Sequence, residues 1–263
     1  MRNASCPGAP AERYEEVRIK LLGAFIDGLT LDQFTERIAF FIERCRSCFI
    51  ITLNPELLYR SQRERSLMDI VNRADLVTAD GVGIVWASRT AGQPVPERVT
   101  GIDLMMRLLQ SAASHGWRVF FLGSYPGVAE SASKRAVELF PGLQVAGSYH
   151  GFFSQEQNCQ VVELIVGSKT QLLLVALGAP LQEKWIAANL SSLGNIAAVG
   201  VGGSLDVLSG NVRRAPRWMV RTNLEWLGRL LMEPSRWKRM LVLPKFMALV
   251  LVKYKIGKYL VSK

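Results

Sequence analysis

The chain has 263 residues, of which 49% are hydrophobic, and a formal net charge of +10. This length suits one α/β core with an appendage, and the composition excludes a disordered chain. The charge is uneven, because residues 211–263 hold 13 Lys and Arg against two acids, whereas the rest holds 19 basic and 20 acidic residues. A near-neutral core argues against nucleic-acid binding, and a basic tail rich in Trp, Leu and Val favours an anionic lipid surface.

Residues 1–16 predict a flexible leader, because Pro7, Gly8 and Pro10 interrupt them and no apolar period is present. They lack the charged start and apolar core of a secretory signal. We therefore expect a reducing cytoplasmic setting for the four cysteines. Cys45 and Cys48 form a single CxxC without a second pair or nearby histidines, so we interpret both as packing residues and expect no metal site.

From residue 17 onward, strand-like apolar runs alternate with amphipathic helical runs. We expect strands at residues 18–22, 25–26, 48–52, 75–78, 118–122, 143–148, 171–177 and 195–199. We expect helices at residues 31–44 with Thr30 as N-cap, after Pro55, and at residues 82–88, 102–114, 128–140, 155–167 and 181–190. The repeated βα order predicts an α/β fold with a mostly parallel sheet covered by helices over residues 17–211.

The basic segment of residues 212–263 predicts an amphipathic helical appendage. Arginines suit phosphate oxygens, and here they alternate with tryptophans and leucines, as expected at lipid headgroups. The arginines in question are Arg213, Arg214, Arg217, Arg221 and Arg229. The longest apolar run, residues 246–252, is far shorter than the ~20 residues of a membrane-spanning helix. We therefore expect peripheral association rather than spanning.

Polar residues follow two strands of the predicted sheet. Thr52 and Asn54 end one strand, and Asp80 ends the next, directly before Gly81 and Gly83. Carboxyl ends of parallel strands open into the crevice where ligands bind. Asp80 is thus a candidate for chemistry, although a plain helix N-cap is an equal explanation for an Asp at this position.

Two glycine clusters are phosphate-cradle candidates. One is Gly81 with Gly83, and the other includes Gly202 and Gly203. Neither completes the three-glycine dinucleotide fingerprint, because Trp86 and Leu205 occupy the third positions. Tight turns remain an alternative. Similarly, Gln182 could bind a sugar or base at a strand-to-helix turn, although a solvated first helical turn explains the neighbouring Glu183 and Lys184 equally well.

Five segments together resemble the WecG/TagA/CpsF family of bacterial glycosyltransferases (glycosyltransferase family 26). They are residues 52–56, 79–83, 97–104, 178–185, and 214–216 followed by 224–227, and the similarity spans residues 17–239. The resemblance implies a Rossmann-like core and an inverting, metal-independent transfer from a UDP-sugar to a polyprenyl-diphosphate-linked sugar, without a cofactor. It also implies an appendage that holds the protein on the cytoplasmic face of the inner membrane and completes the site.

By the same resemblance, Asp80 matches the general base, and Thr52, Asn54, Arg98 and Gln182 match pocket residues. A base that takes a proton from the acceptor hydroxyl suits inverting transfer. Arg98, Arg214 and Arg221 are the expected cations for the leaving diphosphate. The donor, the acceptor sugar and any homo-oligomeric state stay open. The rival hypotheses are a non-enzymatic nucleotide-binding module recruited to anionic membranes and, less favoured, a nucleotide-dependent oxidoreductase.

Overall fold

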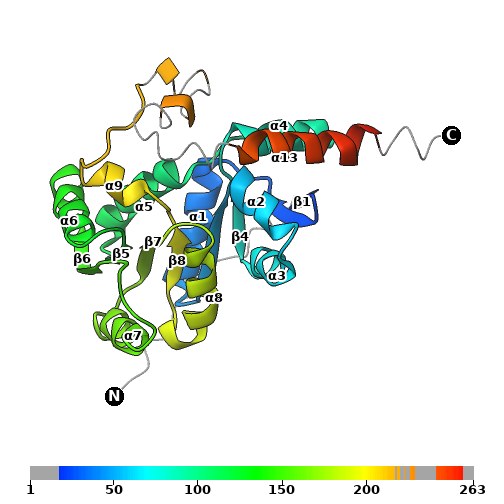
Figure 1. Ribbon diagram of the computed structural model, residues 1–263. Coiled ribbons are helices and arrows are strands. Elements are labelled where there is room, and N and C mark those ends of the chain that lie inside the picture. Colours follow the sequence, from blue (N-terminus) through cyan, green and yellow to red (C-terminus); the bar gives the residue numbers. More distant parts are fainter. Residues whose placement is uncertain (1–17, 217, 220–221, 223–225, 229–240, 257–263) are drawn as a thin grey trace.

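Six parallel strands form the central sheet of the computed structural model, which describes residues 18–216, 218–219, 222, 226–228 and 241–256. Their spatial order is β4-β3-β8-β7-β5-β6 (Figure 1). The strands are β3 (Cys48–Leu53), β4 (Leu76–Ala79), β5 (Arg118–Gly123), β6 (Gln144–Tyr149), β7 (Leu172–Ala176) and β8 (Ala197–Gly200). The prediction of a mostly parallel α/β sheet is confirmed.

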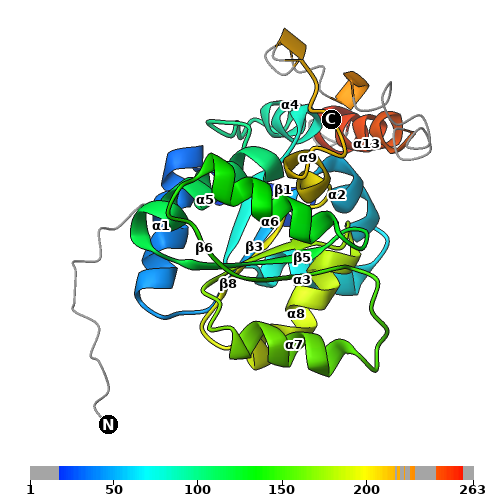
Figure 2. The same cartoon turned by 90° about the vertical axis from the view of Figure 1, so that its left-hand side faces the viewer.

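Helices cover both faces of this sheet (Figures 1 and 2). One face packs against α1 (Leu31–Glu43), α5 (Gly101–His115), α6 (Val128–Leu139) and α9 (Ser204–Leu208). The other packs against α2 (Pro55–Ser61), α3 (Arg65–Arg73), α4 (Val82–Thr90), α7 (Asn158–Gly167) and α8 (Leu181–Leu193). The central strands are therefore apolar on both sides, which is why they read as continuous hydrophobic runs.

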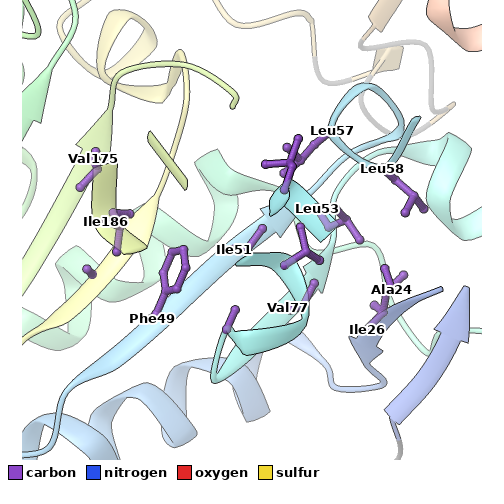
Figure 3. Packing of buried hydrophobic residues seen from close by; sticks show 14 of the residues in the cluster. Ala24, Ile26, Phe49, Ile51, Leu53, Leu57, Leu58, Val77, Val175 and Ile186 are labelled. Atoms are coloured by element: carbon purple, nitrogen blue, oxygen red, sulfur yellow. The ribbon is translucent and has the colours of Figure 1, made fainter. Parts of the chain in front are cut away.

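Strand β3 shows how the two cores divide. Phe49, Ile51 and Leu53 point into one core, where they meet Val77 of β4 and Leu57 of α2 (Figure 3). The alternate residues of the strand belong to the other core. Thr52, buried near the carboxyl end of β3, and Asn54, directly after the strand, are the polar residues at this end.

An antiparallel hairpin, β1 (Arg18–Leu21) and β2 (Ala24–Asp27), protects the outer edge of β4. The Asp27 carboxylate accepts hydrogen bonds from the backbone of Val77 at 2.7 Å and from Arg18 Nε at 3.1 Å. Burial raises the pKa of Asp27, although both partners oppose that shift. The hairpin thus occupies an edge that would otherwise expose backbone groups for pairing.

Three local expectations can be compared with the structure. Thr30 caps α1 with a complete capping box, as predicted. The helix after Pro55 is divided into α2 and α3, and the Gln62 side chain bonds to the carbonyl of Leu22 at the break. The packing interpretation was right for Cys48, which is buried in β3, and wrong for Cys45, which is exposed with φ 49° in the turn after α1.

The C-terminal helix α13 (Val242–Leu251) and a π-helical turn, η2 (Val252–Ile256), lie on α2 and α4 (Figure 1). Phe246 and Val250 are buried there, and the backbone N–H of Leu22 donates to the Tyr254 hydroxyl at 2.8 Å. The same segment also exposes large apolar side chains, namely Leu241, Met247 and Val252. Within the described residues, no helix is long and apolar enough to cross a membrane. Residues 1–16, Arg217, Arg221 and Arg229 lie outside the described residues.

Candidate active site

A cavity of about 280 Å³ opens at the carboxyl edge of the sheet. Nine of the residues singled out from the sequence line it: Thr52, Asn54, Asp80, Gly81, Gly83, Arg98, Gln182, Gly202 and Gly203. The C-terminal part of the chain adds Trp226, Val242 and Leu243 to its wall. Segments far apart in sequence therefore form one polar site with an apolar side.

Asp80 follows β4 and lies against the start of a different helix, α5. Its backbone N–H donates to the Leu53 carbonyl at 2.9 Å, and its Oδ2 accepts from the Gly101 N–H at 3.2 Å. The N-cap of the helix that follows Asp80 is Gly81, at φ 92°, with no side-chain cap. The plain N-cap explanation for Asp80 is therefore wrong, because the carboxylate binds the first residue of α5 and faces the cavity.

Thr52 and Asn54 are both held by the protein. Thr52 is buried and donates from Oγ1 to the Gly200 carbonyl at 2.7 Å, which joins the ends of β3 and β8. Asn54 caps α2 by accepting from the Leu57 N–H at 2.9 Å through Oδ1. Because Oδ1 is used for the cap, the Nδ2 group of Asn54 remains as a donor for a ligand.

The segment before α5 carries Arg98 into the cavity wall. Val99 pairs with β4, since its N–H donates to Ala79 and its carbonyl accepts from Thr78 Oγ1. Thr100 then caps α5. The backbone that follows Arg98 is thus anchored, and Arg98 lines the same cavity as Asp80 and Gly101.

Close backbone approaches explain two of the glycines. A Cβ on Gly83 would lie 2.6 Å from Pro55 Cγ, so the starts of α4 and α2 can touch only with glycine at that position. A Cβ on Gly200 would lie 2.8 Å from Gln182 Nε2. Gly81 has a positive φ that side chains rarely adopt. These glycines bring helix N-termini together around the cavity.

Gln182, in the first turn of α8, is 3% exposed and hydrogen-bonded at both ends of its amide. Oε1 accepts from the Gly202 N–H at 3.0 Å, and Nε2 donates to Glu183 Oε1 at 2.8 Å. The hypothesis of a solvated first turn is wrong for Glu183, which is only 1% exposed, and right for Lys184, whose side chain is 42% exposed. Burial raises the pKa of Glu183 to about 7, against the opposing hydrogen bond from Gln182.

Arg214 does not line this cavity. Its Nη2 binds Asp103 Oδ1 at 2.7 Å, and Asp103 Oδ2 accepts from Thr100 Oγ1 at 2.6 Å. Arg214 borders a second space of about 290 Å³ beside α5, α6 and α9. In the structure Arg214 therefore contacts the first turn of α5, whose first residue, Gly101, binds Asp80.

Two features escaped the sequence interpretation. One is the buried Glu183, which no local pattern distinguishes from a surface carboxylate. The other is a stacked aromatic pair, Tyr125 and Phe152, whose ring centroids are 4.8 Å apart and whose side chains are 66% and 61% exposed. They follow β5 and β6, at the carboxyl edge of the sheet. Nearby, Ser124 Oγ donates to Asp206 Oδ1 at 2.7 Å.

Among the described residues, metal ligands are not gathered at this edge. The part of the chain that the structure describes has no group of three or more His, Cys, Asp or Glu side chains able to hold a metal ion. What the cavity offers are hydrogen-bond donors. The N-termini of α4, α5 and α8 border it, and such termini attract anions.

The sheet and cavity define a Rossmann-like α/β protein with its polar site at the carboxyl edge, the usual arrangement of nucleotide-dependent enzymes. Residues 19–259 match the Glycosyl transferase WecG/TagA/CpsF family, and the chain belongs to this family of glycosyltransferases. The resemblance seen in the sequence is thereby confirmed.

Named relatives extend over most of the chain. A protein of Bacillus spizizenii is 37% identical over 211 residues, covering 80% of this chain and 81% of the relative. One of Bacillus subtilis is 34% identical over 211 residues, covering 80% and 82%. One of Staphylococcus aureus is 33% identical over 249 residues, covering 94% and 95%. All three are named N-acetylglucosaminyldiphosphoundecaprenol N-acetyl-beta-D-mannosaminyltransferase.

Proposed function

We propose that the chain transfers a sugar, N-acetylmannosamine in the first instance, from a UDP-sugar to N-acetylglucosamine carried on undecaprenyl diphosphate. The acceptor and the transferred sugar follow the names of the relatives. The UDP donor and an inverting course are the expectations from the family resemblance. The observation that carries the proposal is the carboxylate of Asp80, held beside helix N-termini in one cavity.

Asp80 is the proposed general base. The acceptor hydroxyl gives its proton to the Asp80 carboxylate while its oxygen attacks the anomeric carbon. The bond from that carbon to the UDP oxygen breaks on the opposite face, which inverts the configuration. The hydrogen bond from Gly101 to Oδ2 orients the carboxylate for this step.

The departing diphosphate gathers negative charge that the site must stabilise. Arg98 and the N-termini of α4 and α8 border the cavity and supply positive charge and N–H donors. The Gly202 and Gly203 backbone lets a phosphate approach closely. Arg221 is proposed as an additional cation from the appendage, and Arg214 as an indirect contributor through α5.

The stacked pair of Tyr125 and Phe152 is a suitable platform for the donor nucleoside. Both rings are exposed at the carboxyl edge of the sheet, outside the residues that line the cavity. Aromatic faces stack on planar bases without needing further hydrogen bonds. Asp206, bonded to Ser124, adds a carboxylate that can accept from a ribose hydroxyl.

The C-terminal part is proposed to place the enzyme on the cytoplasmic face of the membrane. Leu241, Met247 and Val252 are exposed beside Lys245 and Lys253, a combination that favours anionic headgroups. The same part contributes Val242 and Leu243 to the cavity. Residues 212–263 therefore serve both as membrane contact and as one wall of the site in this proposal.

A direct test is UDP release by the purified chain with a synthetic lipid-diphosphate N-acetylglucosamine. UDP-N-acetylmannosamine, its uronic acid, UDP-glucose and UDP-N-acetylglucosamine are compared as donors. Mass spectrometry identifies the product, and NMR of the anomeric carbon and proton establishes its configuration. We expect acceptor-dependent release and an inverted product. UDP binding without transfer from any donor would instead support the non-enzymatic module.

A further inference from the structure

We infer that Glu183 is a positioning residue for the glycine loop of residues 201–203, acting through the side-chain amide of Gln182. This inference deepens the proposed function and rests on it for its kinetic test only. Its starting observation is a carboxyl group that is 1% exposed in the first turn of α8. Buried carboxyl groups are costly and need a partner or a role.

The amide of Gln182 has one orientation because of Glu183. A carboxyl oxygen that accepts at 2.8 Å requires the NH₂ end of Gln182 to face it. The carbonyl end of Gln182 must then face the Gly202 N–H, which donates to it at 3.0 Å. If Glu183 could not accept, the buried NH₂ group of Gln182 would lose this acceptor, and the amide would lose one of the two hydrogen bonds that hold it in place.

The loop is fixed from two sides at the end of β8. Gln182 packs directly on Gly200, where a Cβ would lie 2.8 Å from Nε2. From the other side, Thr52 donates to the Gly200 carbonyl at 2.7 Å. Val201, Gly202 and Gly203 line the cavity directly after this point. Loss of the Gln182 hydrogen bond would therefore release backbone in the cavity wall.

The strength of the hydrogen bond from Gln182 to Glu183 depends on pH. Burial raises the pKa of Glu183 to about 7, and Oε2 of the same carboxyl has no hydrogen-bond partner in the described part of the chain. A carboxylate accepts a hydrogen bond more strongly than a neutral acid does. As pH rises through this range, the Gln182 amide is held more firmly.

Charged neighbours of α8 are at the surface. The cause of the raised pKa is burial, and no neighbouring charge contributes to it. On α8 itself, Lys184 forms an ion pair with Glu64, the N-cap of α3. Strand β8 carries no titratable side chain, and β3 carries only Cys48, at its opposite end. The remaining charged or titratable side chains on the packed helices are the exposed Arg65, Asp69, Arg73, Cys159 and Glu163.

The test compares wild type with Glu183→Gln and Glu183→Leu, and uses Glu64→Gln as the matched surface control. Amide NMR of ¹⁵N-glycine-labelled protein follows Gly202 from pH 5.5 to 8.5, with the signal assigned by its loss in Gly202→Ala. We expect the wild-type Gly202 shift to titrate near pH 7, and no such titration in Glu183→Gln. The control should titrate like wild type. This readout does not depend on transferase activity.

Kinetics with the lipid-linked acceptor complete the test. Glu183→Gln can still accept from Gln182, so its kcat/KM should stay within about threefold of wild type while the inflection near pH 7 disappears. Glu183→Leu should remain folded, as judged by circular dichroism, and lose ~10- to 100-fold in kcat/KM. A Gly202 signal that titrates unchanged in Glu183→Gln would overturn the inference. So would a Glu183→Leu enzyme as active as wild type.

Discussion

The backbone N–H of Gly101 donates a 3.2 Å hydrogen bond to Oδ2 of Asp80. This hydrogen bond joins the carboxyl end of β4 to the first residue of α5. The two residues come from different segments of the family resemblance, residues 79–83 and 97–104. Arg214 binds the same helical turn through Asp103 at 2.7 Å. The proposed base and the beginning of the appendage therefore share one support, the N-terminus of α5.

Asp80→Asn should nearly abolish transfer while leaving UDP-sugar binding close to wild type. An Asn oxygen can still accept from Gly101, so the local structure is kept while the base is lost. We expect kcat to fall by roughly 10²- to 10⁴-fold. UDP release measures turnover, and calorimetry with UDP measures binding. Residual activity above about a tenth of wild type would contradict the assignment of the base, since general bases contribute far more than tenfold.

Phe152→Ala should raise the KM for the donor with little change in kcat. The side chain is 61% exposed and stacks on Tyr125, so its removal costs little fold stability. Stacking on a base is worth about 1–3 kcal/mol, which corresponds to a roughly fivefold or larger rise in KM. Phe40→Ala, at an exposed position on α1, is the control and should leave KM unchanged. An unchanged KM in Phe152→Ala would place the nucleoside elsewhere.

Gly200→Ala should lower kcat/KM by about tenfold or more, because displaced site groups commonly cost that much. The added methyl carbon would lie 2.8 Å from Gln182 Nε2, which forces the amide away from Gly202. Gly167→Ala is the matched control, because a Cβ there meets nothing within 4 Å. Steady-state kinetics and thermal melts of both variants separate a site effect from a loss of stability. Equal activity of both variants would show that the Gln182 contact is dispensable.

Replacing Leu241, Met247 and Val252 with Ser should release the protein from anionic vesicles. Each side chain is at least 44% exposed, so the fold should tolerate the change. Burial of a large apolar side chain contributes about 1.5–3 kcal/mol, so three replacements should reduce partitioning by well over tenfold. Vesicle flotation measures the fraction of protein bound to the vesicles. Leu164→Ser with Val166→Ser, equally exposed on α7, is the control and should float like wild type.

Glu183→Gln should change how stability depends on pH. The pKa of Glu183 is raised from 4.5 to about 7 in the folded state. Between these values the unfolded chain ionises while the folded chain keeps its proton, so wild-type stability falls as pH rises, and above pH 7 this loss is complete. The Gln variant lacks this loss, and its relative gain should reach at most about 3 kcal/mol by pH 8. Urea unfolding at pH 4.5 and pH 8 measures the free energy of unfolding of both proteins. An equal difference between wild type and variant at the two pH values would refute the prediction.

Most of the fold could be predicted from the sequence because its parallel strands are buried on both faces. Such strands appear as continuous apolar runs, and the helices between them carry one apolar stripe. The position of β8 between β3 and β7 could not be predicted in this way. Strand order depends on which helices pack on which face of the sheet. The local hydrophobic periodicity of the sequence does not determine this order.

The candidate site was predictable where polar residues end buried strands, as Thr52 and Asp80 do. It was not predictable where partners meet only through tertiary packing. Tyr125 and Phe152 come together because β5 and β6 are neighbours. Glu183 looks like an ordinary helix-surface carboxylate, and its burial results from the close packing of α8 on β8. The support of Arg214 by Asp103 spans 111 positions of sequence.

Val242 and Leu243 form part of the cavity wall, and they also begin the helix whose solvent-exposed side carries Met247, with Val252 directly after the helix. A helix with its side chains is only about 10–12 Å across. With that side resting on a bilayer, as proposed, the mouth of the site lies roughly one helix width from the headgroups. An acceptor sugar can then enter on its diphosphate while the polyprenyl chain stays in the lipid. Turnover would follow the number of acceptors per unit of membrane area, and dilution with inert lipid at constant total acceptor would slow the enzyme.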